Sequence, residues 1–343
     1  MASRTTYETT VTKQTLNRVT APSMPFAWSI NPYRGCAHGC SFCYARKFQS
    51  FLGRGADDQF QRHIVVKANA AEALEAQLSR LLRKYGGDRE ALGRHIGEVA
   101  IGTATDPYQP VESRARLTRE CLKVLAKYRV PTSITTRSPL ILRDLDIIAE
   151  MNVKQVNVSI NTLRGDLVRK LEPASPLPAK RLEVVAELSA RGVRAGIFAA
   201  PVLPCLTDSA SDLEALFRAA KAHDASFAHA SLLRLSRDVK PWFMRVLEQH
   251  FPHLRNAYPR LYAGENACEA YARPKRKMIE ALLKKYGFIH EKPAASNAPE
   301  SFPPNRPLTG QPSGIQRDSR DRTDSPERSA PVPEQLAFRF DET

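Results

Sequence analysis

The sequence predicts an α/β protein in which parallel strands form a partial (β/α)6 barrel. Two observations predict it. Six short apolar or β-branched runs occur between Phe26 and Leu233, and longer stretches with the 3.6-residue period of amphipathic helices separate them. Strand and helix units in series produce a parallel sheet that curls into a partial or complete barrel, with its site at the carboxyl ends of the strands.

The expected strands are the runs 26–30, 97–102, 132–136, 155–160, 193–200 and 227–233. Two of the helices between them have start signals. One follows Asn69, an expected cap with Glu72 three residues later, and another begins with a capping box formed by Ser211 and Glu214. A further helix at 113–128 places Cys121 on its apolar face, which predicts that this cysteine belongs to the core.

The chain is expected to have four parts. An N-terminal extension covers residues 1–25, the barrel covers 26–235, and a helical extension of the barrel domain covers 236–290. From residue 291 to 343 the composition changes to Pro, Ser, Arg and Asp with few apolar residues. Such a segment buries too little apolar surface to offset the entropy of ordering it, so we expect a disordered tail.

The cellular location is predicted from two missing signals. The chain has no run of roughly 18 apolar residues, which a membrane span requires, and residues 1–14 lack the apolar stretch of a secretion signal. We therefore expect a cytoplasmic protein with no membrane association. Because that compartment keeps thiols reduced, its six cysteines are not expected to pair, and a tight group of them indicates metal binding or redox catalysis.

The positive charge is unevenly distributed along the chain. The formal net charge is +15, whereas residues 291–343 contain seven basic and nine acidic residues, so the part before them carries an excess of about +17. A basic body suits a phosphate-rich partner, because binding a nucleic-acid backbone releases its counterions. A surface that only maintains solubility would have the same composition, and charge alone does not separate the two.

Three cysteines, Cys36, Cys40 and Cys43, lie within eight residues directly after the first expected strand. A structural zinc site needs four ligands, usually from two C-x2-C pairs, and the sequence has no second pair. His38 lies between two of the cysteines in a very short loop, which makes it a poor fourth ligand. A 4Fe-4S cluster held by three thiolates instead leaves one iron without a protein ligand, where a substrate can bind.

This C-x3-C-x2-C spacing, with the aromatic Phe42 before the last cysteine, resembles the motif of the radical S-adenosylmethionine (SAM) superfamily. The resemblance implies a partial barrel of radical SAM type in which SAM binds the open iron of a 4Fe-4S cluster. It also implies that an electron, from a donor such as flavodoxin or ferredoxin, cleaves SAM and yields a 5′-deoxyadenosyl radical that abstracts hydrogen from the substrate.

Three later segments resemble spore photoproduct lyase and its relatives: "VSINTL" at 158–163, "KLEPASPLPAKRLE" at 170–183 and "GIFAAPVLP" at 196–204. The similarity covers about residues 31–235. It implies by position that Thr105 and Ser159 contact SAM and that Arg137 is a basic SAM ligand. Tyr44, directly after the last cysteine, resembles a tyrosine of the lyase site.

Several of these residues also have a purely structural interpretation. Ser159 and Asn161 end an expected strand and are candidates for cofactor binding, but small polar residues there also cap a following helix. Arg137 is equally consistent with a surface cation on a basic protein. Glu172 precedes two prolines and is typical of a turn, although a carboxylate at a barrel mouth also suits the ribose or amino group of SAM.

One position departs from the lyase. The lyase has a cysteine near the end of the second strand that donates a hydrogen atom to the product radical, and this chain has Thr103 there. A hydroxyl O–H bond is too strong to donate hydrogen readily, so repair by the lyase's own route is not expected. Cys205, after the fifth strand, is a possible substitute thiol, although a loop cysteine without function is the more common case. Cys268 has no assigned role.

Together these features predict a radical SAM enzyme that repairs or modifies a nucleic-acid base, with DNA favoured over RNA. Two alternatives stay open: radical modification of RNA or of a peptide, and an iron–sulfur nucleic-acid-binding module without catalysis. The tail favours DNA, because Gln335, Leu336, Phe338 and Phe340 resemble the hexapeptide that binds the bacterial sliding clamp in extended form. A tail that contacts its own domain is the alternative interpretation.

Overall fold

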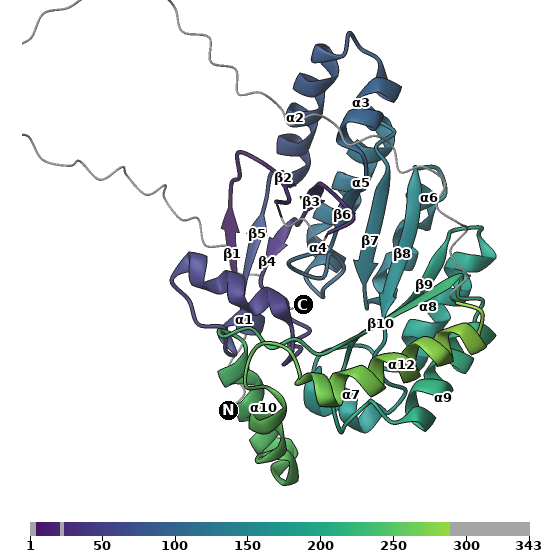
Figure 1. Ribbon diagram of the computed structural model, residues 1–343. Coiled ribbons are helices and arrows are strands. Elements are labelled where there is room, and N and C mark those ends of the chain that lie inside the picture. Colours follow the sequence, from purple (N-terminus) through teal and green to yellow (C-terminus); the bar gives the residue numbers. More distant parts are fainter. Residues whose placement is uncertain (1–4, 21–23, 289–343) are drawn as a thin grey trace, which may run out of the picture. The chain divides into compact units, whose positions relative to one another are not determined.

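The computed structural model describes residues 5–20 and 24–288, all within one compact unit. The expected disordered tail, with the candidate clamp motif at 335–340, lies outside the described residues. The boundaries that we expect for the N-terminal extension, the barrel and the helical extension stay predictions. The main sheet has seven strands in the order β10-β9-β8-β7-β6-β3-β2 (Figure 1).

Six strands of the main sheet are parallel: β3 (Trp28–Ile30), β6 (Val99–Ile101), β7 (Thr132–Thr136), β8 (Val153–Ser159), β9 (Ala195–Val202) and β10 (Phe227–Leu232). Each coincides with one of the six expected runs, and their curved arrangement confirms the partial-barrel α/β fold. A seventh strand, β2 (Leu16–Arg18), pairs antiparallel with β3 at one edge. Paired positions form a buried row across the sheet, made of Ile30, Ile101, Ile134, Val156 and Ala195.

A second, three-stranded sheet was not expected from the sequence. Its central strand β5 (His63–Lys67) pairs parallel with β1 (Thr6–Thr10) and antiparallel with β4 (Tyr33–Arg34). Neither β1, which is polar, nor β4, which has two residues, shows a strand pattern of its own, and the pairing depends on the buried apolar residues of β5. This small sheet matters for the site, because the three-cysteine loop begins where β4 ends.

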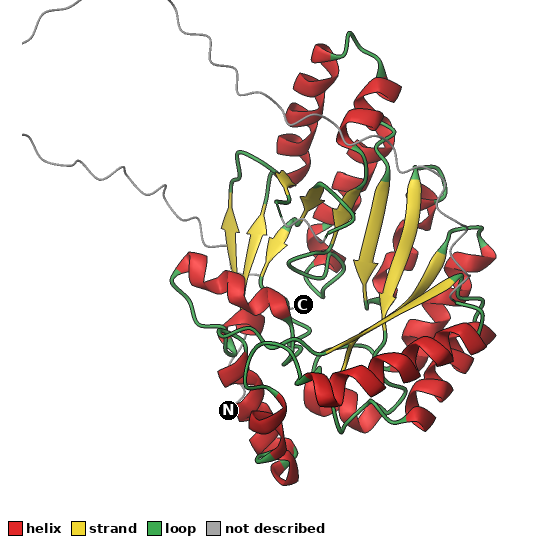
Figure 2. Ribbon diagram, in the orientation of Figure 1, coloured by secondary structure: helices red, strands yellow, loops and turns green. Residues whose placement is uncertain are grey.

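Helices cover the outer side of the main sheet, whereas α10 (Lys240–His250) lies apart from it, below the three-stranded sheet in this view (Figure 1 and Figure 2). Before β10 they are α2 (Ala70–Lys84), α3 (Arg89–Ile96), α4 (Glu112–Ala115), α5 (Leu117–Lys127), the 3-10 helix η2 (Pro139–Asp144), α6 (Leu145–Ile148), α7 (Gly165–Leu171), α8 (Pro178–Ala190) and α9 (Ala210–Ala222). After β10 come α10 (Lys240–His250), η3 (Pro252–Leu254), α11 (Ala257–Leu261) and α12 (Glu269–Lys285). The helix α8 packs on β8 and β9, and α12 packs on β10 and α9. None of the helices in these two described ranges combines the length and apolar character that a bilayer span requires.

Two expected helix starts are wrong in detail. The helix α2 does begin after Asn69, but the Asn69 side chain accepts from the backbone N–H of Thr12 at 2.7 Å and does not cap the helix. The cap of α9 is Ser209, two residues before the expected Ser211, and the Ser209 hydroxyl accepts from the N–H of Asp212 at 3.1 Å. A tertiary contact decides the first case, whereas the second is a choice between two nearby serines. Cys121 is completely buried in the core, as expected.

Candidate active site

The three-cysteine loop, residues 35–43, connects β4 to the 3-10 helix η1 (Tyr44–Leu52). Its first residue, Gly35, has a φ of +76°, and a Cβ there would lie 2.6 Å from the His63 carbonyl oxygen and 2.8 Å from that of Phe60. The next backbone N–H, that of Cys36, donates to the Phe60 oxygen at 3.0 Å. A side chain at position 35 would therefore push the loop away from β5 and from the short helix α1 (Gln59–Arg62) before it.

The three thiols lie in a mostly buried environment. Cys36 and Cys40 are buried, and Cys43 is partly buried and packs in one apolar group with Cys36 and in another with Cys40. Burial raises the pKa of Cys40 to about 12 and raises that of Cys36 further, so both are neutral thiols until a metal displaces their protons.

The donor set fits a 4Fe-4S cluster better than a single ion. Across residues 5–20 and 24–288, no three His, Cys, Asp or Glu side chains converge to hold one metal ion. A 4Fe-4S cluster makes no such demand, because each thiolate binds a different iron. Three neighbouring cysteines on one loop would supply ligands to three of the four irons.

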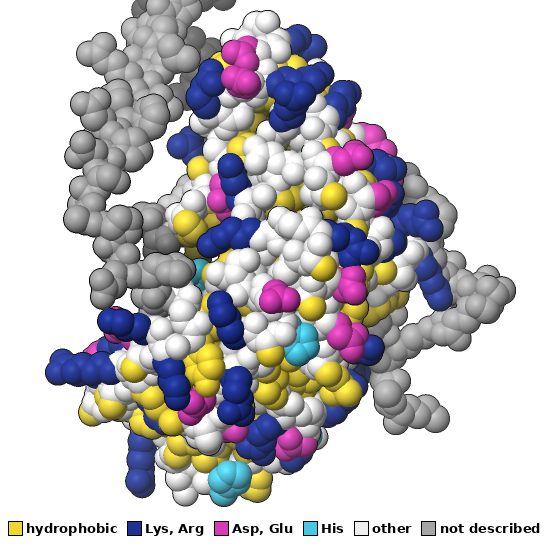
Figure 3. Space-filling model, turned by 90° about the vertical axis from the view of Figure 1, so that its right-hand side faces the viewer, with side chains coloured by type: hydrophobic (Ala, Val, Ile, Leu, Met, Phe, Trp, Pro, Cys, Tyr) yellow, Lys and Arg dark blue, Asp and Glu magenta, His cyan; other side chains and the backbone are white. Residues whose placement is uncertain are grey.

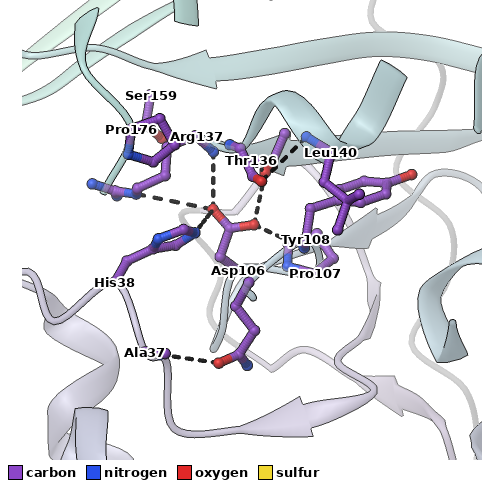
Figure 4. Close-up of polar contacts among 12 residues, drawn as sticks. Ala37, His38, Asp106, Pro107, Tyr108, Thr136, Arg137, Leu140, Ser159 and Pro176 are labelled. Atoms are coloured by element: carbon purple, nitrogen blue, oxygen red, sulfur yellow. Dashed lines mark hydrogen bonds and ion pairs between the residues drawn. The ribbon is translucent and has the colours of Figure 1, made fainter. Parts of the chain in front are cut away.

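The ring of His38 points toward Asp106, in the loop after β6 (Figure 4). Its Nε2 lies 3.5 Å from Oδ2 of Asp106, and its Nδ1 lies 3.3 Å from the carbonyl oxygen of Ala174. Burial lowers the pKa of His38, which favours the neutral imidazole despite the nearby carboxylate. His38 thus ties the loop to the barrel, which agrees with rejecting it as a fourth metal ligand.

Asp106, in the loop after β6, connects three segments. Its Oδ1 accepts hydrogen bonds from Thr136 Oγ1 at 2.7 Å and from the N–H of Tyr108 at 2.9 Å. Its Oδ2 accepts from the N–H of Arg137, directly after β7, at 2.9 Å. Together with His38, these contacts join the cysteine loop to the carboxyl ends of β6 and β7 (Figure 4).

Arg137 and Glu172 form a buried ion pair that extends the network to β8. Arg137 Nη1 donates to Glu172 Oε2 at 2.8 Å, and Arg181 Nη2 donates to the same oxygen at 2.6 Å. Arg181 Nη1 also donates to the carbonyl oxygen of Ser159 at 2.9 Å. Burial alone would raise the pKa of Glu172, but Arg181 and Arg137 hold it below its usual value. The structure thus brings Arg137 and Glu172 together inside the barrel, and neither is a surface residue.

Thr105 and Gln109 form a second clamp on the cysteine loop. The Thr105 hydroxyl donates to the Gly35 carbonyl oxygen at 2.6 Å and accepts from Gln109 Nε2 at 2.9 Å. The Oε1 atom of Gln109 accepts from the N–H of Ala37 at 3.0 Å. Sequence reasoning missed Gln109, since a single Gln in a loop has no pattern; it is completely buried. The expected SAM contact of Thr105 stays a prediction.

Tyr44 and Thr103 come together from separate segments. The Tyr44 hydroxyl donates to the Thr103 carbonyl oxygen, and Asn31 Nδ2 donates to Thr103 Oγ1 at 3.0 Å. About half of the Tyr44 side chain remains exposed. Phe42 is instead buried in the apolar cluster that contains Leu167.

Ser159 and Asn161 are both nearly buried at the carboxyl end of β8. The residue that precedes α7 is Arg164, so neither of them caps that helix, and the structural alternative does not apply. Their role in binding a cofactor stays a prediction.

Cys205 lies in the turn after β9 and has a φ of +60°, which is rare for a residue with a side chain. Its Sγ is 3.7 Å from the hydroxyl of Tyr271, which in turn donates to a carboxylate oxygen of Asp208. The other oxygen of Asp208 accepts from the N–H of Cys205 at 2.9 Å. In the described part of the chain, no hydrogen bond joins this group to Tyr44 or Thr103.

Comparison with known proteins gives one family and several relatives. The model of the radical SAM superfamily matches residues 30–219. An uncharacterized protein of Mycobacterium tuberculosis is 34% identical over 286 residues, which cover 82% of this chain and 81% of that protein. An uncharacterized protein of Methanocaldococcus jannaschii is 29% identical over 241 residues, covering 70% and 82% of the two chains.

Solved structures of spore photoproduct lyase share the fold. One mutant form has a TM-score of 0.59 with 16% identity, covering 82% of this chain and 79% of the lyase. The lyase complexed with dinucleoside spore photoproduct has a TM-score of 0.56 with 17% identity and the same coverage.

Proposed function

The chain belongs to the radical SAM superfamily and is a radical SAM enzyme, and we propose that it acts on a base in nucleic acid, DNA in the first place. The observation that carries the proposal is the loop with Cys36, Cys40 and Cys43, held against the carboxyl ends of β6 and β7. When bound, the 4Fe-4S cluster and SAM supply the electron and the 5′-deoxyadenosyl radical that abstracts a substrate hydrogen.

The chain's own polar side chains orient these groups. The side chains that we assign to the SAM site come from the cysteine loop, from the carboxyl end of β8, from the segments after β6, β7 and β8, and from the end of α7: Phe42, Ser159, Thr105, Arg137, Asn161 and Glu172. The Thr105 hydroxyl already donates to the Gly35 carbonyl oxygen, and Arg137 already donates to the Glu172 carboxylate. They therefore fix the cysteine loop relative to the strands before a cofactor binds, which lowers the cost of ordering the site.

Charge supports nucleic acid as the substrate class. The chain before residue 291 carries about +17. On the face shown in Figure 3, Lys and Arg side chains are spread from top to bottom among fewer acidic ones. Spore photoproduct lyase structures with a dinucleoside lesion share the fold of this chain, which adds a fold-level analogy only. Radical modification of RNA or a peptide is the second candidate, favoured by Thr103 in the position of the lyase cysteine.

We propose that Tyr44, Thr103 and Cys205 line the place where hydrogen atoms are transferred to and from the substrate. Tyr44 is exposed beside the cysteine loop and bonded to Thr103, which places a phenol next to the cluster ligands. Thr103 supplies a polar contact and no weak S–H bond. The exposed thiol of Cys205 is the candidate donor of a hydrogen atom to a substrate radical, which would leave a thiyl radical on its sulfur, 3.7 Å from the Tyr271 hydroxyl. Cys205→Ser would then give substrate radical without product.

Further partners follow from the proposed reaction. An electron donor such as flavodoxin or ferredoxin reduces the cluster in the cytoplasm. The segment with Gln335, Leu336, Phe338 and Phe340 binds the sliding clamp and brings the enzyme to replicated DNA. A peptide covering 331–343 should bind purified clamp with roughly micromolar affinity, and Gln335→Ala with Phe340→Ala should abolish binding. Equal binding by both peptides, or by neither, contradicts this partner.

The decisive experiment measures hydrogen transfer. Anaerobically reconstituted protein is reduced with dithionite and incubated with SAM and a deuterated oligonucleotide, and 5′-deoxyadenosine is analysed by mass spectrometry. Deuterium should enter 5′-deoxyadenosine with DNA, and Cys43→Ala should form none. Label transfer from RNA but not DNA selects the second candidate. No 5′-deoxyadenosine from the wild type would leave only a non-catalytic iron–sulfur binding module.

A further inference from the structure

Arg46 is a completely buried cation at the base of the three-cysteine loop, and sequence reasoning did not single it out. It lies in η1, three residues after Cys43. Its guanidinium carbon is 5.0 Å from the ring centroid of Phe60 and 5.2 Å from that of Trp242. The two aromatic rings therefore hold the guanidinium and exclude water from it.

The guanidinium of Arg46 holds the backbone of the loop directly. Its Nε donates to the carbonyl oxygen of Cys40 at 2.8 Å, and its Nη2 donates to that of Gly39 at 3.0 Å. The remaining donors bond Gln61 Oε1 at 2.7 Å and the carbonyl oxygens of Asp57 and Ala56 at 2.5 and 3.3 Å. Every partner is a neutral oxygen, so hydrogen bonding is satisfied while the charge is not neutralised.

The lack of a counter-charge distinguishes Arg46 from its neighbours. Within residues 5–20 and 24–288, no Asp or Glu side chain forms an ion pair with Arg46. Arg181, the other completely buried arginine in these ranges, has Glu172 as its partner, and Arg137 shares that carboxylate. A buried cation that no anion contacts is strongly unfavourable, and the Asp57 carboxylate acts on Arg46 without forming an ion pair with it. Further negative charge is therefore expected near Arg46 in the working protein.

The loop thiols are groups near Arg46 that become anionic when a metal binds. Burial lowers the pKa of Arg46, whereas Cys43, Cys40 and Cys36 in their thiolate form raise it most, followed by the carboxylate of Asp57. The Arg46 guanidinium bonds the loop that carries the three thiols directly, through Gly39 and Cys40. Three thiolates give a 4Fe-4S cluster a net negative charge, and reduction adds one more negative charge. A fixed cation stabilises the reduced cluster more than the oxidised one, because the attraction grows with the charge.

We propose that Arg46 is the built-in counter-cation of the iron–sulfur cluster: it positions the loop through the Gly39 and Cys40 carbonyl groups and raises the reduction potential of the cluster. This inference rests on the proposed function, since it requires a cluster on the three cysteines. Arg46 is a positioning and electrostatic residue and contacts no substrate. Its effect is therefore expected on the potential and on cluster retention, in the absence of SAM or any substrate.

The test is a redox titration followed by electron paramagnetic resonance on reconstituted full-length protein without SAM. Arg46→Met and Arg46→Gln remove the positive charge, and Arg46→Lys keeps the charge but lacks the planar guanidinium group with its several N–H donors. Arg83→Met, at an exposed position of α2, is the matched control. The neutral variants should have lower potentials than the wild type, Arg46→Lys should lie between them, and the control should be unchanged.

Each outcome decides the matter. A neutral variant with full iron and sulfide content and the wild-type potential overturns the proposal. Both neutral variants could lose their iron although circular dichroism shows a folded apoprotein. In that case, iron retained by Arg46→Lys supports the need for a positive charge. Iron lost from Arg46→Lys as well contradicts it. A wild-type protein that binds no cluster would refute the proposed function itself, which is a different result from an unchanged potential in the variants.

Discussion

Replacing Glu172 by Gln is the sharpest test of the buried network that holds the strand ends together. The substitution keeps the size and shape of the side chain and removes its charge. Oε2 of Glu172 accepts from Arg137 at 2.8 Å and from Arg181 at 2.6 Å, and only 1% of the residue is exposed. With Gln there, Arg181 loses the one ionic partner that it has among residues 5–20 and 24–288, and the site gains a net positive charge.

The expected loss of stability follows from this burial. Breaking a buried ion pair by neutralising one partner costs about 3 to 5 kcal/mol, because the remaining charge stays desolvated. The Gln oxygen can still accept one neutral hydrogen bond, which places the expected loss near the lower limit, about 3 kcal/mol. An exposed pair is worth about 0 to 1 kcal/mol, so Glu183→Gln, which removes the exposed partner of Lys180, is a matched control.

The assay is urea denaturation of the apoprotein at pH 7, followed by circular dichroism, for the wild type and both variants. Apoprotein is used so that no cofactor contributes. A loss below about 1 kcal/mol for Glu172→Gln, equal to that of Glu183→Gln, would refute the reasoning, because it would mean that the network does not stabilise the fold.

The pH dependence gives an independent check. Arg181 and Arg137 hold the pKa of Glu172 below its usual value against the effect of burial, so its carboxylate stabilises the folded state fully above the unfolded-state pKa of about 4.3. That contribution is lost as pH falls through the lower folded-state pKa. The difference in unfolding free energy between the wild type and Glu172→Gln should be constant from about pH 6 to 8 and should shrink below about pH 4. If the difference in unfolding free energy between the two proteins grows as the pH falls, the lowered pKa of Glu172 does not stabilise the fold as expected.

Three further outcomes are expected. Cys40→Ala should abolish iron and sulfide binding because two thiolates cannot hold the cluster, whereas Cys121→Ala, in the core, should leave the iron content unchanged; the reverse would overturn the ligand assignment. Gly35→Ala should cost about 3 kcal/mol, since it combines a positive φ with a backbone clash, whereas Gly86→Ala, which has space for a Cβ, should cost about 1 kcal/mol; equal losses by denaturation would disprove the clash. Ser209→Ala should cost about 1 kcal/mol as a lost cap, and no change would show that α9 begins elsewhere.

Local patterns were sufficient for the six parallel strands of the main sheet, but not for β2, which pairs antiparallel at its edge. All six parallel strands lie where apolar and β-branched runs occur, because burial on both faces leaves a mark in each strand's own residues. The small sheet was missed, since β1 is polar and β4 has two residues, and both are strands only through pairing with β5. The cap of α2 was misassigned because the Asn69 side chain has a better partner in Thr12, which lies 57 residues away.

Candidate site residues were predictable where spacing or resemblance marks them, as for Cys36, Cys40 and Cys43. Arg137 and Glu172 were singled out, but their direct contact was not foreseen. His38, Asp106 and Arg181, which complete the network, had no signal as a group, because each comes from a different segment and single charged residues occur throughout a basic chain.

The sequence by itself determined the order of the six parallel strands, the spacing of the three cysteines and the absence of a fourth cysteine beside them. Those properties depend on residues that are close together in the sequence, so they can be recognised without knowing the fold. Only the tertiary structure decided which charges are paired. Arg137 and Arg181 converge on Glu172, whereas Arg46 is buried between two aromatic rings and forms no ion pair with a carboxylate of the described residues. The physical reason is that electrostatic energies depend on distance and on desolvation, and both are set by packing between segments far apart in the chain.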